Sequence, residues 1–357
     1  MTRVGGFLLR RVAAGVFTLL ALLLATFVVY WVLPSTPAQI VYPQAQHLSD
    51  YQIKHGNHLL GLDRPKVVQY ADYVWRLAQG DLGKGWDGSE LVPVDHLQQP
   101  SLNAVVLPAT RRTLSLILGG AALVVLLAVP LGAFAGTRVG SLSDRTVMTL
   151  TLIGICTHPM VLGNVLQIVF GYGHLNWFSS AGYCPLIRGP HDACGGVRDW
   201  ASHLALPWLT FALLYLALYT RMIRASVSDT LHEEFVRTAR AKGASETRVL
   251  TRHVLPNASM RVLTMVGMEI GTAIGLCIYI EHVYNLNGIA DQAVIAMGGA
   301  TTDIDLPFTL AIVTMITLIV VLGNLIVDLL YAVVDPRAGW RREGGSVPVI
   351  ASPKGAE

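Results

Sequence analysis

Charged residues are scarce in this chain. Only 14% of its 357 residues are Asp, Glu, Lys or Arg, whereas 53% are hydrophobic. A typical soluble domain carries about 25% charged residues. This shortage excludes an ordinary soluble domain and predicts a polytopic membrane protein. The net charge of +3 is too small to argue for a nucleic acid partner, so none is expected.

Cysteines and catalytic motifs are also few. Four cysteines do not make a disulfide scaffold in a chain of this length. The sequence has no G-x-x-x-x-G-K-[ST] loop, so it does not hold a nucleotide in that manner. It also lacks the H-E-x-x-H and G-x-S-x-G motifs, and no His or carboxylate spacing indicates a metal site. We therefore expect neither an enzyme, an intramembrane one included, nor a cofactor or metal bound by this chain.

Long apolar segments are what the sequence does contain. Six of them approach the roughly 20 residues that a helix needs to cross a bilayer, and they cover about 12–33, 114–135, 147–170, 207–222, 260–280 and 308–332. Basic residues gather at both ends of the chain and after the second and fourth segments, which places these parts in the cytoplasm. The predicted fold class is an all-α polytopic membrane protein. It has six transmembrane helices, both termini in the cytoplasm, and a small extracytoplasmic segment between helices 1 and 2.

This topology divides the chain into four parts. They are an N-terminal segment with the first helix (1–34), an extracytoplasmic segment (35–109), a core of five transmembrane helices (110–335) and a cytoplasmic tail (336–357). Pro65, followed by apolar residues at helical spacing, predicts an amphipathic helix in the second part that ends at Gly80. Its apolar face would consist of Val67, Ala71, Val74 and Ala78.

The longest water-compatible stretch between two apolar segments is residues 230–256, here called the basic loop. Thr230 and Glu233 have the spacing of a capping box, which predicts a helix start, and Gly243 is suited to a left-handed C-terminal cap. Ser245 is placed to cap a second helix, which Pro256 would end. The first helix would present an apolar face made of Leu231, Phe235 and Ala239.

The basic loop has three possible interpretations. A helix–turn–helix with basic charge is compatible with DNA binding, but the flanking apolar segments place it at a membrane surface. A solvated loop that obeys the positive-inside rule needs no partner. A docking element for another protein is the third reading, and charge alone does not separate it from the second.

The order of residues in the basic loop resembles a known pattern. Gly243, nine further residues and then His253-Val254-Leu255-Pro256 is similar to the EAA loop of ABC importer permeases. The run R-T-A-R-A-K-G at 237–243 resembles the version found in the dipeptide/oligopeptide/nickel transport family, although Arg237 stands where the general pattern has Glu. Segments 61–65, 80–83, 281–290 and 324–337 resemble other parts of that family's permeases. The resemblance identifies a permease subunit of binding-protein-dependent transport with a type I transmembrane domain.

The resemblance implies a set of partners and a role for the loop. Within the coupling loop 223–257, residues 234–243 would form a short helix that sits in a cleft of an ATPase subunit. The residues implied in this coupling are Glu234, Arg237, Ala239, Arg240, Ala241, Lys242, Gly243 and Pro256. The implied partners are a second homologous permease, two cytosolic ATPase subunits that carry ATP and Mg²⁺, and an extracytoplasmic solute-binding protein. The implied location is the bacterial cytoplasmic membrane, which the chain crosses several times.

The predicted function is therefore half of the translocation path of an ATP-driven importer, with peptides as the solute. Nickel chelates, or another small solute of the same family, are the alternative. A secondary transporter driven by an ion gradient is a further alternative, but it predicts inverted repeats, and no convincing repeat is seen.

Two polar side chains lie deep within the apolar segments. Glu269 either lines the translocation path or makes a hydrogen bond to another helix, because a carboxylate in lipid costs about 2.5–3.5 kcal/mol on insertion scales. Gly267, Gly271 and Gly275, in the same segment, allow a partner helix to approach closely. His158 either lines a polar path or is satisfied by a neighbouring helix or by a carbonyl freed at Pro159.

Cys184 and Cys194 lie together in a polar segment that the topology places outside the membrane. Their separation makes a disulfide geometrically easy, and an oxidising exterior would permit it. Two free thiols remain the alternative.

Overall fold

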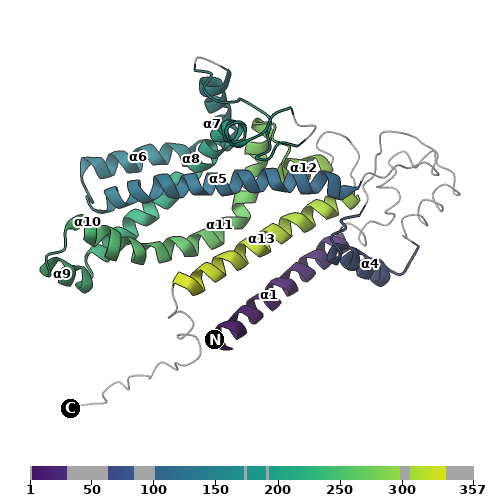
Figure 1. Ribbon diagram of the computed structural model, residues 1–357, viewed down its shortest axis with the longest axis horizontal. Helices are drawn as coiled ribbons and strands as arrows, with labels where there is room; N and C mark the ends of the chain where they lie inside the picture. Colours follow the sequence, from purple (N-terminus) through teal and green to yellow (C-terminus); the bar gives the residue numbers. More distant parts are fainter. Residues whose placement is uncertain are drawn as a thin grey trace, which may run out of the picture.

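The computed structural model describes residues 2–29, 63–83, 101–172, 175–189, 193–297 and 306–334. Within these ranges the regular elements are helices, and the longest of them lie side by side as a bundle (Figure 1). The predicted tail at 336–357 and most of the predicted extracytoplasmic segment at 35–109 lie outside the described residues.

The helical elements of the described residues follow in chain order. They are α1 (Thr2–Phe27), α4 (Lys66–Ala78), α5 (Leu102–Gly136), α6 (Leu142–Cys156), α7 (Pro159–Leu166), the π-helix η4 (Gln167–Tyr172), α8 (Val197–Leu231), α9 (Glu234–Ala241), α10 (Glu246–Val249), the π-helix η5 (Leu250–Val254), α11 (Leu255–Val283), α12 (Ile289–Ala296) and α13 (Leu306–Val334).

The helices of the described residues confirm the prediction of a helical membrane protein. Among them α5, α8 and the Phe308–Leu330 part of α13 are long and apolar enough to cross a membrane. A fourth span results if the bent pair of α6 with α7 and η4 is one span, and the apolar part of α1, Val12–Phe27, is shorter.

The third predicted segment, 147–170, is a broken helix, and its bend is sharper than the proline kink expected at Pro159. α6 and the α7–η4 pair meet at an angle of 105°. The break falls at Thr157 and His158, which both have extended backbone conformations. Pro159 explains the position, because its ring disfavours the helical conformation of the preceding residue. His158 then becomes the N-cap of α7, and its Nδ1 accepts a hydrogen bond from the amide of Met160 at 3.3 Å.

The second and fourth predicted segments are parts of much longer helices. α5 and α8 each contain 35 residues, so both extend well beyond the predicted ranges of 114–135 and 207–222. Hydropathy detects only the apolar middle of such a helix, and its polar ends continue with the same backbone hydrogen bonds.

The close contact between α5 and α8 depends on small residues of α5. A Cβ atom added at Gly132 would lie 2.9 Å from the carbonyl oxygen of Thr220, and one at Gly136 would lie 2.8 Å from that of Arg224. Without side chains at these positions, the two backbones approach closely, as small residues allow in membrane proteins. The main buried cluster lies along this contact and includes Leu116, Phe211 and Ile223.

α4 lies against α1 and α13 at one end of the bundle (Figure 1), and its bounds confirm the predicted helix at 65–80. The predicted apolar face is wrong, however, because Val67 is 80% exposed. The helix instead turns its tyrosines inward. Tyr70 donates a hydrogen bond to the carbonyl oxygen of Leu20 at 3.0 Å, and the buried hydroxyl of Tyr73 bonds that of Thr314.

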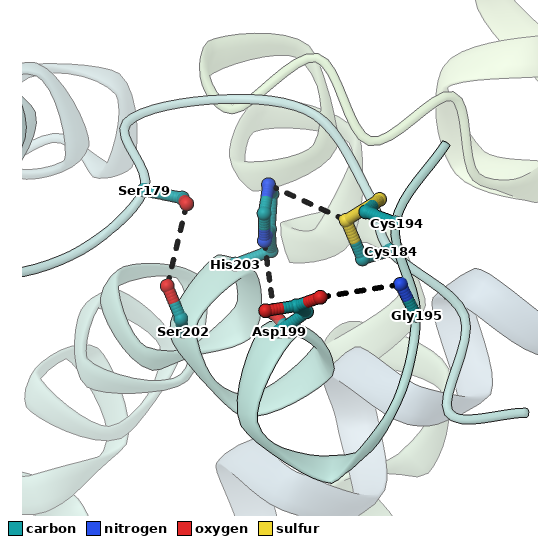
Figure 2. The surroundings of a disulfide bond; sticks show 7 residues. All are labelled: Ser179, Cys184, Cys194, Gly195, Asp199, Ser202 and His203. Atoms are coloured by element: carbon teal, nitrogen blue, oxygen red, sulfur yellow. Dashed lines mark hydrogen bonds between the residues drawn. A yellow bond between two sulfur atoms is a disulfide. The ribbon is translucent and has the colours of Figure 1, made fainter. Parts of the chain in front are cut away.

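The segment between η4 and α8 is closed by a disulfide. Cys184 and Cys194 are bonded, with their Cα atoms 5.6 Å apart, and Cys184 is buried. Figure 2 shows the ring of His203 between Asp199 and this disulfide. Nδ1 of His203 donates to the carbonyl oxygen of Asp199 at 2.8 Å, so Nε2 faces Sγ of Cys184 at 3.6 Å. The disulfide therefore fixes the segment against the first turns of α8.

Replacing Gly136 with leucine should destabilise the protein by about 1–3 kcal/mol, because the new side chain would meet the backbone of α8, which cannot rotate away. The measurement is the thermal unfolding midpoint of the purified protein in detergent. Ala121→Leu on an exposed part of the same helix is the matched control and should leave the midpoint unchanged. An unchanged midpoint in the Gly136 variant would contradict the close contact.

Replacing both Cys184 and Cys194 with serine should cost about 2–3 kcal/mol in the chain-entropy model for a loop of this size. The loss should appear as faster proteolytic cleavage between η4 and α8 in the otherwise folded protein. Cys156→Ser, which removes a free and exposed thiol, is the control. Equal cleavage rates in all three proteins would show that the bond contributes nothing to the order of this segment.

Candidate functional site

The basic loop forms a compact turn at the end of the bundle opposite α4 (Figure 1). α9 ends in a Schellman motif, in which two amides bond back to carbonyl groups of the last turn. The amide of Gly243 donates to the carbonyl oxygen of Arg240 at 2.9 Å, and that of Ala244 donates to Ala239 at 3.2 Å. Gly243 has a φ of 78°, which confirms the predicted left-handed cap.

The first helix of the loop is anchored by a residue that the predicted face leaves out. Val236 is fully buried, in the same hydrophobic cluster as Val249 and Val254. Phe235, by contrast, is 42% exposed, so the predicted face of Leu231, Phe235 and Ala239 is wrong in its central member. The error arises because Leu231 is the last residue of α8, whereas α9 begins at Glu234. The helical spacing counted from Leu231 therefore does not apply to α9.

The predicted capping box is also wrong. Thr230 lies inside the last turn of α8, where its Oγ1 donates to the carbonyl oxygen of Ser226 at 2.7 Å. α9 begins at Glu234, and Glu233 occupies its N-cap position without a side-chain hydrogen bond. α8 therefore continues through Thr230 with its own backbone hydrogen bonds, and no helix begins at the predicted capping box.

The second helix of the loop does not stop at Pro256. Ser245 takes the N-cap position of α10 without a side-chain hydrogen bond, and α10, η5 and α11 then follow one another without a gap. Pro256 lies in the first turn of α11. The π-helical turn of η5 accommodates a residue that has no amide hydrogen to donate. The loop is thus continuous with a long helix of the bundle.

One ion pair joins the two halves of the loop across Gly243. Nε and Nη2 of Arg240 donate to the two carboxylate oxygens of Glu246 at 2.8 and 3.0 Å. The Arg240 guanidinium lowers the pKa of the Glu246 carboxyl through these hydrogen bonds. Both side chains are exposed, so we expect the pair to orient α9 against α10 more than to stabilise the fold.

Seven of the predicted coupling residues lie together on α9 and its cap. Ala239 is partly buried, and the others face solvent: Glu234, Arg237, Arg240, Ala241, Lys242 and Gly243. Pro256 lies apart from them in α11. The arrangement is a short helix with a buried anchor and a charged outer surface, which suits contact with another protein.

A buried polar clamp lies at the junction of α11 and α12. The carboxylate of Glu281, fully buried, accepts hydrogen bonds from Oγ1 of Thr113 at 2.5 Å and from the amide of Asp291 at 2.9 Å. Thr113 in turn accepts from the amide of Ile289 at 2.8 Å. A Cβ atom at Gly288 would lie 2.3 Å from the Glu281 carboxyl group, so a side chain there would displace the carboxylate. The clamp joins α5, α11 and the start of α12.

The two deep polar side chains lie in different surroundings. His158 is exposed at the break between α6 and α7, and its ring meets that of Tyr279 edge-on at 5.1 Å. The hydrogen-bond partner of His158 is therefore the amide of Met160. The predicted bond to a carbonyl freed at Pro159 is wrong. Glu269 is partly exposed on α11 and accepts a hydrogen bond from the hydroxyl of Thr272. Within the described ranges, no cluster of three or more His, Cys, Asp or Glu side chains is placed to hold a metal ion.

Comparison with known proteins shows which family this chain matches. Residues 128–340 match the family model of the binding-protein-dependent transport system inner membrane component, and residues 4–90 match the model of its N-terminal part. The di/tripeptide transport system permease protein DppB of Pseudomonas aeruginosa is 30% identical over 349 residues, which cover 94% of this chain and 99% of that protein. A Brucella ovis protein that carries the name of a peptide permease is 32% identical over 331 residues, covering 92% of this chain and 97% of that protein.

These matches extend over nearly the whole chain, and they agree with the resemblance of the basic loop to the permeases of ABC importers. The chain belongs to the family of inner membrane components of binding-protein-dependent transport systems.

Proposed function

We propose that this chain is the membrane-spanning permease subunit of an ATP-driven ABC importer for peptides. It would form half of the translocation path together with a second, homologous permease. The names of its relatives, which are peptide and di/tripeptide permeases, support peptides as the solute. An extracytoplasmic solute-binding protein would deliver the peptide to the outer end of the path.

The proposed topology has six spans with both termini in the cytoplasm of a bacterial cell. The spans are α1, α5, the bent pair of α6 with α7 and η4, α8, α11 and α13. The amino-terminal end of α1 and the carboxyl end of α13 point to the same end of the bundle as α9 and α10 (Figure 1). That end carries most of the basic residues, which favours the cytoplasm. The disulfide segment would then face the oxidising exterior.

The proposed coupling element is α9, which would sit in a cleft of a cytosolic ATPase subunit. ATP and Mg²⁺ would be bound by two such partner subunits. The observation that carries this proposal is the rigid connection from α9 to α11. Val236 seats α9 on the bundle, the Schellman turn at Gly243 fixes its direction, and α10 and η5 continue directly into α11. Movement of the ATPase would therefore move a membrane helix.

Replacing Gly243 with valine should uncouple peptide uptake from ATP hydrolysis in the assembled transporter. A β-branched residue at a φ of 78° costs about 1–2 kcal/mol, which would reorient α9 against α10. The measurement is peptide taken up per ATP hydrolysed in proteoliposomes, which we expect to fall about tenfold while the protein remains inserted.

Two control variants separate this effect from general backbone strain. Gly243→Asn should keep most of the coupling, because asparagine tolerates the left-handed conformation. Gly140→Val places the same strain in the loop before α6, where φ is 82°, and should leave coupling unchanged. A Gly243→Val protein with normal uptake per ATP would contradict the role of the turn.

Replacing residues 234–243 with a Gly/Ser linker should remove the ATPases from the complex that is purified through the tagged chain. The linker deletes the docking surface and its anchor Val236, but leaves the long helices in place. Mass spectrometry of the native complex should find two ATPases with P-loops and a second permease. The variant should retain the permease alone. ATPases that stay bound to the variant would place the docking surface elsewhere.

A further inference from the structure

Glu269 lies at the midpoint of α11, which runs from Leu255 to Val283. In the proposed topology it is therefore near the middle of the membrane, where a carboxylate is costly and faces a cavity or a partner. The neighbouring surface of α11 is polar and small: Gly271, Thr272 and Gly275 are exposed. A Cβ atom added at either glycine would have no neighbour within 4 Å.

One hydroxyl group bonds the carboxylate, and two tyrosines of a neighbouring helix lie beyond it. Oγ1 of Thr272 donates to Oε2 of Glu269, one turn away on the same helix. From α8, the hydroxyl of Tyr215 lies 3.4 Å from that of Thr272, and the ring of Tyr219, one turn further along α8, lies 6.1 Å from the ring of Tyr215. Two helices that are far apart in the sequence thus place one acid and two hydroxyls together, with a second tyrosine one turn away on α8.

No cation accompanies Glu269 among the side chains that the structure describes. The ion pairs in the described part of the chain join Arg64, Arg224, Arg240 and His282 to acids other than Glu269. Of these, His282 lies more than three turns along α11 and pairs with Asp291. A carboxylate that keeps its charge at this depth is stabilised by a positive partner. The open surface beside it leaves room for that partner to be a solute.

We propose that Glu269, with Thr272, Tyr215 and Tyr219, forms a site in the translocation path that binds the primary ammonium group of a passing peptide. The inference rests on the proposed function, because it takes the solute to be a peptide. The carboxylate supplies the opposite charge, and the hydroxyls, with their lone pairs, accept the remaining ammonium hydrogens. The carboxylate end of the same peptide would be repelled, so the site also orients the solute.

A metal ion is a poorer match for this group. Glu269 is its single carboxylate, and protein-bound Ca²⁺ and Mg²⁺ prefer several charged or carbonyl oxygens. The neutral hydroxyls of two tyrosines and a threonine suit an ammonium group, which needs hydrogen-bond acceptors more than it needs charge.

The test measures peptide binding to the whole transporter, purified through this chain and reconstituted in nanodiscs without the solute-binding protein. Saturation-transfer NMR gives the affinities of tri-alanine and of N-acetyl-tri-alanine, which lacks the ammonium group. We expect the free peptide to bind about tenfold more tightly, the lower end of the range for a hydrogen bond to a charged group. Glu269→Gln should reduce this ratio to about one, and Glu269→Asp should keep most of it.

Two further variants place the effect at this site. Thr272→Val removes the hydroxyl that orients the carboxylate and should lower the ratio about threefold. Thr146→Val is the matched control. The hydroxyl of Thr272 also donates to the backbone carbonyl oxygen of Glu269 at 2.9 Å, and that of Thr146 donates in the same way to Leu142 at 2.9 Å, but on α6. The control variant should leave the ratio unchanged.

N-acetyl-Ala-Lys-Ala amide identifies the source of the ammonium group. Binding as tight as that of tri-alanine supports a site for any primary ammonium group, and binding as weak as that of N-acetyl-tri-alanine supports one for the amino terminus. Equal affinities of the free and acetylated peptides in the native complex would overturn the inference, as would a ratio that survives in Glu269→Gln.

Loss of the second permease from the Glu269→Gln complex would also overturn the inference, because it would show that Glu269 pairs with a cation of that subunit. The proposed function fails in a different way. Absence of ATPases from the native complex would contradict the importer itself, whereas equal affinities in a complex that contains them would contradict only the ammonium site.

Discussion

Burial of Val236 ties the exposed end of the bundle to its long helices. The residue shares one hydrophobic cluster with Val249 and Val254, so α9 is held against the segment that continues as α11. Gly243 sets the angle between the two halves of the loop, and the ion pair of Arg240 with Glu246 spans the turn. A short helix held in this way behaves as a rigid extension of the bundle. The charged residues on its outer surface are then free to contact a partner.

α11 is fixed at both ends and open in its middle. At one end it continues from the basic loop, and at the other Glu281 clamps it to α5 and α12 with fully buried hydrogen bonds. Between these ends lies the polar surface around Glu269. If α11 moves as one body in the proposed mechanism, a displacement at α9 reaches both the surface around Glu269 and the clamp of Glu281.

The sequence predicts the helical class, the extent of helix α4 and the left-handed turn at Gly243, because each depends on local pattern. It does not predict the clamp of Glu281, whose partner Thr113 lies 168 residues away. It also misplaces the apolar face of α9, because α8 extends through Leu231 and changes the helical phase. The break at His158 follows from Pro159, but the angle of 105° depends on packing that no local pattern contains.

We propose that this chain carries peptides with energy from ATP bound to partner subunits. The most direct measurement is tripeptide uptake by proteoliposomes that contain the purified complex, with the solute-binding protein outside and ATP inside. We expect uptake that requires both ATP and the binding protein, and that an imposed proton or sodium gradient does not replace. Uptake driven by such a gradient without ATP would instead assign the chain to the secondary transporters.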